Sequence, residues 1–246
     1  MNHTSTVASV SKQIDEANAL AQAGMTLPFI LGETNSLYNE GAPGLSNAFG
    51  AALWGVDFNL YCAATGIKRV HMHQGTNYRY ASWQPVDTST TTKGTKPPYY
   101  GNIAVAATLG DLTVDQVQVQ HLPLPEDTEA AYAVYANSTL ARVMVINMVQ
   151  YNYSAATVDD RPAVIYNFTV PTSCAGNGVV QRLLANGSDA ITGITFNGRS
   201  YNYELDLGMP QLVGNVTKDE ITWVGEDGSF SVTVPCSSAA LVQLSC

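Results

Sequence analysis

The chain has 246 residues, of which only 13% are charged, and its formal net charge is −9. This length is enough for one large domain or two smaller ones with a buried core. The sequence has no basic run to neutralise phosphates and no apolar run of roughly 18 residues. We therefore predict neither nucleic acid nor a membrane as a partner, and no protein partner.

The first part of the chain alternates between helical and strand-like patterns. Val10, Ile14, Ala17 and Ala21 recur at helical spacing, which predicts a helix over 9–23 that ends at Gly24. The short apolar stretches "MTLPFILGE" and "IKRVHMHQG" are typical of strands buried on both faces. Two more helices are expected, one over 46–64 with Phe49, Leu53, Val56 and Leu60 on one face, and a shorter one over 102–110.

The pattern changes near residue 113. Helix, strand, helix, strand, helix is the order of a parallel α/β structure, whereas the later residues form short, partly alternating runs. Asn197-Gly198 and Asp227-Gly228 lie between such runs and predict hairpins. We therefore expect an α/β domain over 1–113, followed by an antiparallel β-sandwich or barrel over 114–246.

Cysteines and glycosylation motifs favour a secretory route. The chain has six N-x-S/T motifs, at Asn2 and, beyond residue 130, at Asn137, Asn152, Asn167, Asn186 and Asn215. Among Cys174, Cys236 and Cys246 at least one disulfide is as well supported as free thiols, and the pairing stays open; Cys62 falls in an expected helix. The first residues do not have the charged and apolar regions of a signal peptide.

The acid Glu33 stands at the end of the first strand-like run, within "LPFILGETNSLYNEG". When parallel strands close into a (β/α) barrel, the chemistry is concentrated at their carboxyl ends. A carboxylate at a strand end also caps helices or pairs with arginine in many proteins. From position alone, the catalytic and the structural reading of Glu33 carry equal weight.

The stretches around Glu33 resemble a known enzyme family. "GETNS", the helix "PGLSNAFGAALWGVDFNLYCAATG" and "IKRVHMHQG" together are similar to the last part of the barrel in glycoside hydrolase family 79, the β-glucuronidase and heparanase group. The similarity continues through the β-rich part. It implies a partial (β/α)8 TIM barrel containing the last two βα units, followed by the family's C-terminal β-sandwich.

The family resemblance implies a retaining mechanism with two carboxylates about 5 to 5.5 Å apart, one acting as nucleophile and one as acid/base. Glu33 matches the nucleophile, and hydrogen bonds from Thr34, Asn35 or Ser36 are expected to favour its ionised form. The acid/base follows an Asn at the end of an upstream strand that this sequence does not contain. Asn39-Glu40 spells the same dipeptide but follows no strand, so we interpret it as a chance match. We expect the isolated chain to be inactive.

The resemblance also suggests residues for substrate binding. Tyr38 and Tyr80 are candidates for contacting a sugar carboxylate, and His73 and Asn35 are candidates for lining the same pocket. Ordinary packing is the competing reading for the tyrosines, and a hydrogen-bonded core position is the competing reading for His73. No metal-ligand spacing and no phosphate loop occurs in the sequence, so no cofactor is expected.

A non-catalytic function stays open beside the glycosidase reading. Trp223, Tyr201 and Tyr203 are candidates for an aromatic face that binds sugars on an accessory β-sandwich, although packing within the sandwich accounts for them more simply. A degenerate fragment without function is the third reading. We expect the chain to descend from a secreted family 79 enzyme that acts on a β-glucuronide or a related carbohydrate.

Overall fold

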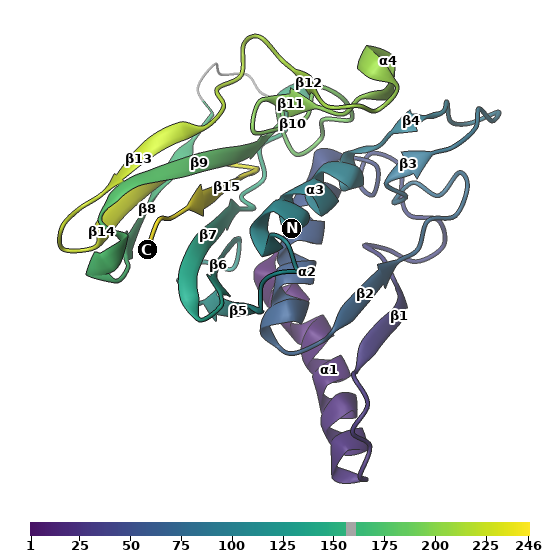
Figure 1. Ribbon diagram of the computed structural model, residues 1–246. Coiled ribbons are helices and arrows are strands. Elements are labelled where there is room, and N and C mark those ends of the chain that lie inside the picture. Colours follow the sequence, from purple (N-terminus) through teal and green to yellow (C-terminus); the bar gives the residue numbers. More distant parts are fainter. Residues whose placement is uncertain (156–160) are drawn as a thin grey trace.

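The computed structural model describes residues 1–155 and 161–246 (Figure 1). It is a mixed structure of helices and mostly antiparallel sheets. The first part contains α1 (His3–Gln22), β1 (Ile30–Thr34), α2 (Phe49–Ala64), β2 (Arg69–Met72), β3 (Trp83–Gln84), β4 (Gly94–Thr95) and α3 (Pro97–Leu109). The second part contains β5 (Val117–Leu122), β6 (Glu129–Ala136), β7 (Thr139–Asn147), β8 (Ala163–Thr169), β9 (Gly176–Leu184), β10 (Thr195–Phe196), β11 (Arg199–Ser200), α4 (Tyr203–Asp206), β12 (Gln211–Leu212), β13 (Glu220–Val224), β14 (Ser229–Pro235) and β15 (Ser238–Gln243).

A nine-stranded antiparallel sheet forms the centre of the second part. Its order is β12-β11-β10-β9-β15-β7-β6-β5, and β13 also pairs with β9. Successive residues of β6 enter different cores: Ala130 and Tyr132 pack with α2 and α3, whereas Ala131 and Ala133 pack with β8 and β14. Because both faces of the sheet are covered, β6 is apolar along nearly its whole length rather than alternating.

Helix α2 is buried on two sides. Phe49, Leu53 and Leu60 face the large sheet together with α3, and Phe58 and Cys62 face α1, β1 and β2. An α-helix with apolar residues around its circumference is stable only when it is enclosed in this way. The division predicted at residue 113 stays a prediction, and α2 and α3 share one core with the sheet beyond it.

The predicted helices are present, and their starts differ for local reasons. α1 begins earlier than expected because the Asn2 side chain accepts a hydrogen bond from the Ser5 N–H, at 2.9 Å. α3 also begins earlier, because prolines occupy its first positions, where no N–H partner is needed. α2 begins at Phe49, three residues later than predicted, and keeps the predicted buried face.

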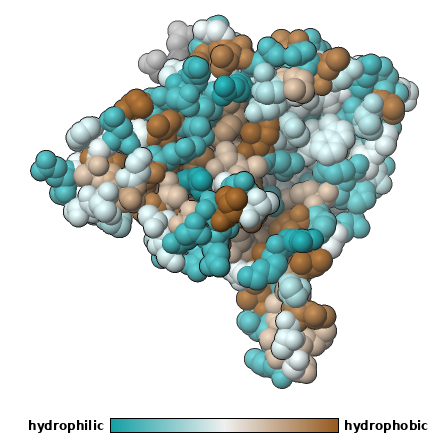
Figure 2. Space-filling view, in the orientation of Figure 1, coloured by the Kyte–Doolittle hydropathy of each residue, from teal (hydrophilic) through white to brown (hydrophobic). Residues whose placement is uncertain are grey.

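The expectation that β1 and β2 are buried on both faces is wrong. The two strands pair with each other in parallel, and within the described residues they have no other strand partner. One face packs on α1 and α2 through Leu31, Val70 and Met72, but the opposite face is open, and Leu27 just before β1 is 76% exposed. Figure 2 shows apolar residues interspersed with polar ones on the projecting end of α1.

Only one of the two predicted hairpins is formed. Asn197 and Gly198 both have positive φ and connect the paired strands β10 and β11, as a type I′ turn requires. The Asp227-Gly228 turn joins β13 to β14, but β13 pairs with β9 and β14 pairs with β8. The second turn therefore carries the chain from one sheet layer to the other.

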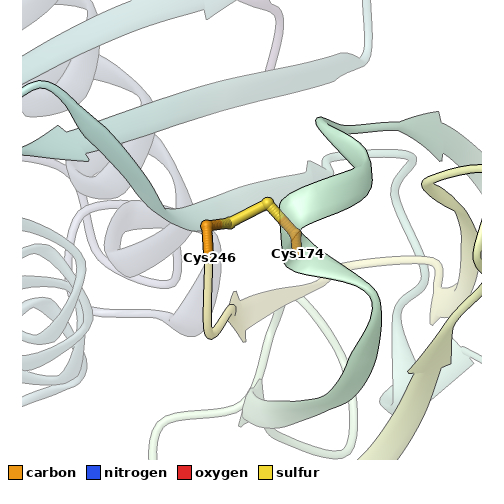
Figure 3. The surroundings of a disulfide bond; sticks show 2 residues. All are labelled: Cys174 and Cys246. Carbon is orange, nitrogen blue, oxygen red and sulfur yellow. A yellow bond between two sulfur atoms is a disulfide. The ribbon is translucent and has the colours of Figure 1, made fainter.

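A disulfide connects Cys174 and Cys246, which closes the β-rich part around the C-terminus (Figure 3). Of the two readings left open for the last three cysteines, the structure has the disulfide. Because 72 residues separate the two cysteines, the loop-closure model gives the crosslink a stabilising contribution of about 4 kcal/mol. In the described part of the chain, Cys62 and Cys236 are buried thiols; burial, and then the charge of Asp57, raise the pKa of Cys62 to about 12.

Asp57 of α2 is a fully buried carboxylate that joins three elements. His3 Nδ1 of α1 lies 2.9 Å from Asp57 Oδ1, and the Tyr132 hydroxyl of β6 donates to the same oxygen at 2.6 Å. The ring of His121 in β5 lies against His3, with ring centroids 4.5 Å apart. Both contacts are made by Asp57 Oδ1, and Oδ2 is buried without a hydrogen-bond partner among the described residues. Across the described ranges, no helix is long and apolar enough to cross a membrane.

The contact between α2 and α3 depends on Gly101. A methyl group there would lie 2.5 Å from the Ala52 carbonyl oxygen, so Gly101→Ala forces the helices apart. We expect a loss of about 1–3 kcal/mol in the free energy of unfolding, measured with urea. Gly55→Ala is the control, because nothing lies within 4 Å of its added methyl and we expect a gain of about 0.5–1 kcal/mol. Equal effects of the two variants would contradict this account.

Stability should fall in weak acid partly through His121. Burial, and then the charge of His3, lower the pKa of His121 below its usual value of 6.5. The unfolded chain therefore takes up this proton first, so the contribution of His121 is complete above pH 6.5 and is lost as the pH falls toward the folded-state pKa. Urea titrations between pH 7 and pH 5 should show a shallower decline for His121→Gln than for the parent. His71→Gln, at an exposed position, should keep the parent slope; an unchanged slope in His121→Gln would refute the assignment.

Candidate functional site

Glu33 is exposed at the carboxyl end of β1 because the strand contains a bulge. Leu31 pairs with Val70 and Thr34 pairs with Met72, so three steps along β1 match two steps along β2. In a regular strand Glu33 would share the face of Leu31 and point at the helices. The extra residue transfers it to the open face, which is a common use of bulges near functional sites.

The ends of β1 and β2 are held together beyond the strand ladder. The His73 N–H donates to the Thr34 carbonyl at 3.0 Å, and the Asn35 side-chain amide donates to the His73 carbonyl at 3.0 Å. The side-chain oxygen Oδ1 of Asn35 in turn accepts from the Ser36 N–H at 2.8 Å. These bonds fix the backbone that follows Glu33 and connect it to His73.

Three aromatic rings stand beside this junction. The His73 ring stacks on Tyr78, with centroids 5.0 Å apart, and meets Tyr80 edge-on at 6.1 Å. Gly75 makes the stack possible, because a methyl at that position would overlap the Tyr78 ring. Tyr80 is buried, and burial, followed by the charges of nearby acidic groups including Glu33, raises its pKa. Its phenol therefore stays a hydrogen-bond donor at neutral pH.

A buried lysine supports the loop that carries these rings. Lys96 Nζ donates to the Tyr78 carbonyl at 2.9 Å and to Gln84 Oε1 at 3.3 Å. Burial, and then the charge of Arg79, lower the pKa of Lys96. Sequence reasoning did not identify Lys96, Tyr78 or Gly75 as parts of the site. The only local signal is the stretch "NYRY", in which Tyr78 and Tyr80 stand two residues apart, shortly after Gly75.

The structure brings together some of the predicted site residues. Glu33, Asn35, His73 and Tyr80 meet at the ends of the two strands, whereas Tyr38 lies in the following loop with 84% of its surface exposed. The expected hydrogen bonds from the neighbours of Glu33 are not formed within the described residues, because Asn35 is engaged with His73 and Ser36. The catalytic and binding roles of these residues stay predictions.

The three aromatic residues predicted for an accessory sugar-binding face do not lie together. Trp223 on β13 pairs with Asn177 at one end of β9, whereas the segment that carries Tyr201 and Tyr203 follows β10, which pairs at Leu183 and Leu184. Six residues of β9 separate these positions, which is a distance of roughly 20 Å. Tyr201 packs against the core beside α3, so it does not contribute to a surface shared with Trp223.

The predicted glycosylation sites differ in accessibility. Asn137, Asn167, Asn186 and Asn215 are exposed, and Asn152 is half-buried, where its side-chain oxygen accepts from the Ser188 hydroxyl at 2.6 Å. Whether they carry glycans stays a prediction. In residues 1–155 and 161–246, no group of three or more His, Cys, Asp or Glu side chains is arranged to hold a metal ion.

The bulge generates a test of the orientation of Glu33. Deleting Thr34 should restore the regular register and place Glu33 opposite Met72, on the face of Leu31 that points toward the helices. We expect carbodiimide labelling of Glu33, read by peptide mass, to be strong in the parent and weak in the deletion variant. Gly32→Ala should label like the parent, because its added methyl meets nothing within 4 Å. Buried Asp57 must stay unlabelled in all three proteins as a check of folding; equal labelling of Glu33 in all three would contradict the bulge assignment.

Comparisons with known proteins agree with this arrangement. Residues 131–241 match the model of the glycosyl hydrolase family 79 C-terminal beta domain. The chain is 58% identical to a beta-glucuronidase of Aspergillus niger and 50% identical to a beta-glucuronidase of Neurospora crassa, with 99% of the chain covered in both. The matches span 47% and 50% of those two proteins, so the chain corresponds to about half the length of its curated relatives.

A solved structure gives the same result in three dimensions. The chain matches a 4-O-α-L-rhamnosyl-β-D-glucuronidase from Fusarium oxysporum with a TM-score of 0.81 and 25% sequence identity. The alignment covers 99% of the chain and 49% of the solved protein. Residues 131–241 therefore carry the C-terminal beta domain of glycosyl hydrolase family 79, and the chain resembles β-glucuronidases over nearly all of its length.

Proposed function

We propose that this chain supplies the nucleophile of a retaining β-glucuronidase, with Glu33 as that nucleophile. The observation that carries the proposal is the bulge in β1, which leaves a carboxylate exposed at the carboxyl end of a parallel strand, beside His73 and Tyr80. The names of the two curated relatives support a glucuronide as the substrate class.

The architecture that fits this role is a (β/α)8 barrel of which β1, α2, β2 and α3 are the last two units, followed by a β-sandwich. The parallel pairing of β1 with β2 across α2, and the open face of both strands, support this proposal. The remaining strands and the acid/base carboxyl would come from residues outside this sequence. The length of the curated relatives, about twice the matched region, is consistent with that source.

The proposed chemistry has two steps. A Glu33 oxygen attacks the anomeric carbon while the bond from that carbon to the leaving oxygen breaks, and the second carboxyl gives its proton to the leaving oxygen. In the second step the second carboxyl, which has lost its proton, takes a proton from water. The oxygen of that water displaces Glu33 from the anomeric carbon. Each displacement inverts the anomeric carbon, so the product keeps the configuration of the substrate.

Tyr80 is the residue that we propose for recognition of the sugar carboxylate. A tyrosine phenol is protonated at neutral pH, and burial raises the pKa of Tyr80 further, so it can donate a hydrogen bond to an anion without a formal positive charge. Glu33 is among the causes of that raised pKa, which supports the proximity of the two groups. Tyr38 and Asn35 are secondary candidates, since Asn35 already spans the two strand ends.

Secretion is proposed on two independent features. The Cys174–Cys246 disulfide is typical of oxidising compartments. Four glycosylation motifs have exposed asparagines, which is the placement that modification requires.

The decisive experiment is a hybrid enzyme. The C-terminal half of the Aspergillus niger relative is replaced by this chain, and hydrolysis of 4-nitrophenyl β-D-glucuronide is measured, with the first-formed anomer assigned by NMR. We expect retention of configuration, and a loss of at least about 10³-fold in kcat for Glu33→Gln. The isolated chain is expected to give no turnover, because the proton donor alone contributes about 10²- to 10⁴-fold.

Glu40→Gln is the matched control, because it removes the same charge from an exposed position in the loop that follows Glu33. Its hybrid should keep activity within a few-fold of the parent hybrid. The nucleophile assignment fails if Glu33→Gln keeps substantial activity, if the product is inverted, or if a folded hybrid shows no hydrolysis. Turnover by the isolated chain that Glu33→Gln abolishes would reject the expected need for a second half.

A further inference from the structure

A second hollow lies away from Glu33, where α4 contacts β4 beside the β3–β4 hairpin (Figure 1). Its volume is about 480 Å³, within the range of small-molecule sites. The walls come from three separate segments: the hairpin, the first turn of α3, and residues 203–208. None of the residues predicted for the Glu33 site lines it.

An exposed tryptophan forms one wall of this hollow. Trp83 is 50% exposed although it sits in the ladder of β3, where it pairs with Thr95 of β4. Tyr99 meets the Trp83 ring edge-on at a centroid distance of 6.2 Å and meets Tyr201 in the same way at 6.0 Å. The indole is therefore held in place by its backbone and by a ring that is anchored to the core. Because the residue is half exposed, its ring is available to a ligand that stacks on it.

Lys93 belongs to the lining of the hollow, and the carboxylate of Glu204 lies near its edge, beside Gly94. Lys93 Nζ lies 5.2 Å from the centroid of the Tyr203 ring. On the other side of the hairpin end, Glu204 Oε1 lies 3.6 Å from the position of a methyl placed on Gly94. The described residues contain no ion pair within 4 Å between these two side chains. A cation and a carboxylate that do not neutralise each other suit a ligand with many hydroxyl groups, because hydroxyls donate and accept.

We propose that this hollow, formed by Trp83, Lys93, Tyr99 and Tyr203, binds a neutral chain of equatorially linked pyranoses. Such chains are flat and present apolar C–H faces along one side, which match an exposed indole, while their edge hydroxyls match Lys93 and Glu204. Lys93 and Glu204 together carry no net charge, which fits a neutral ligand better than a strongly anionic one. This site would hold part of a glycan that is not cleaved, and it does not depend on Glu33 as nucleophile.

The test is calorimetric titration of the 246-residue chain with xylohexaose and with cellohexaose. We expect saturable binding of at least one of them, with a Kd on the order of 1 mM or lower. Trp83→Ala should weaken that binding at least tenfold, and Lys93→Gln should weaken it several-fold. Since Lys93 is exposed, its replacement keeps the test valid even if Trp83→Ala perturbs the hairpin.

Two control variants match these substitutions elsewhere on the surface. Trp223→Ala removes an indole that is 65% exposed on β13, and Lys218→Gln removes an exposed charge; both should bind as the parent does. Glu33→Gln should also bind normally, so failure of the glycosidase proposal and failure of this one are distinguishable. No saturable binding of either glycan at millimolar concentration, or binding that Trp83→Ala and Lys93→Gln leave unchanged, would overturn the proposal.

Discussion

The burial of α2 on two sides is the constraint from which the rest of the structure follows. One side of the helix completes the core of the large antiparallel sheet, and the other supports α1, β1 and β2. Asp57 lies within the same helix and engages His3 on one neighbour and Tyr132 on the other. Apolar packing gives this arrangement most of its stability, whereas the buried carboxylate fixes the position of α1 along α2, because an unpaired charge there would be costly.

This constraint reaches the candidate site through α3. Gly101 lets α3 approach the backbone of α2 closely, and Lys96, the residue before α3, extends its ammonium group to the Tyr78 carbonyl. The loop with the aromatic rings is thereby attached to the core at its far end, and His73 attaches it to β1 at its near end. The surroundings of Glu33 are preorganised by contacts that lie outside the site itself, which is what a catalytic carboxylate requires.

The sequence was informative wherever the signal was local. Helical spacing identified α1 to α3, and Asn197-Gly198 identified its hairpin, because a type I′ turn depends on two adjacent residues. Burial of β1 and β2 was misjudged, since an apolar run does not reveal whether a covering layer is present on both faces. The bulge at Gly32 and Glu33 was equally invisible, because register is a relation between two strands. The role of Lys96 was equally invisible in the sequence, because it depends on the Tyr78 carbonyl and the Gln84 side-chain amide, which are not its sequence neighbours.

The β3–β4 hairpin supports the loop beside Glu33 through Gln84 and contributes Trp83 to the second hollow. Two adjacent residues can do this because successive side chains of a strand point to opposite faces. Gln84 points inward, accepts from Lys96 and from the Asn77 N–H, and so supports the loop beside Glu33. Its neighbour Trp83 must then point outward, where it forms the wall of the second hollow. The ladder that holds the Glu33 loop in place therefore also fixes the orientation of Trp83, and no further element is needed to position the indole.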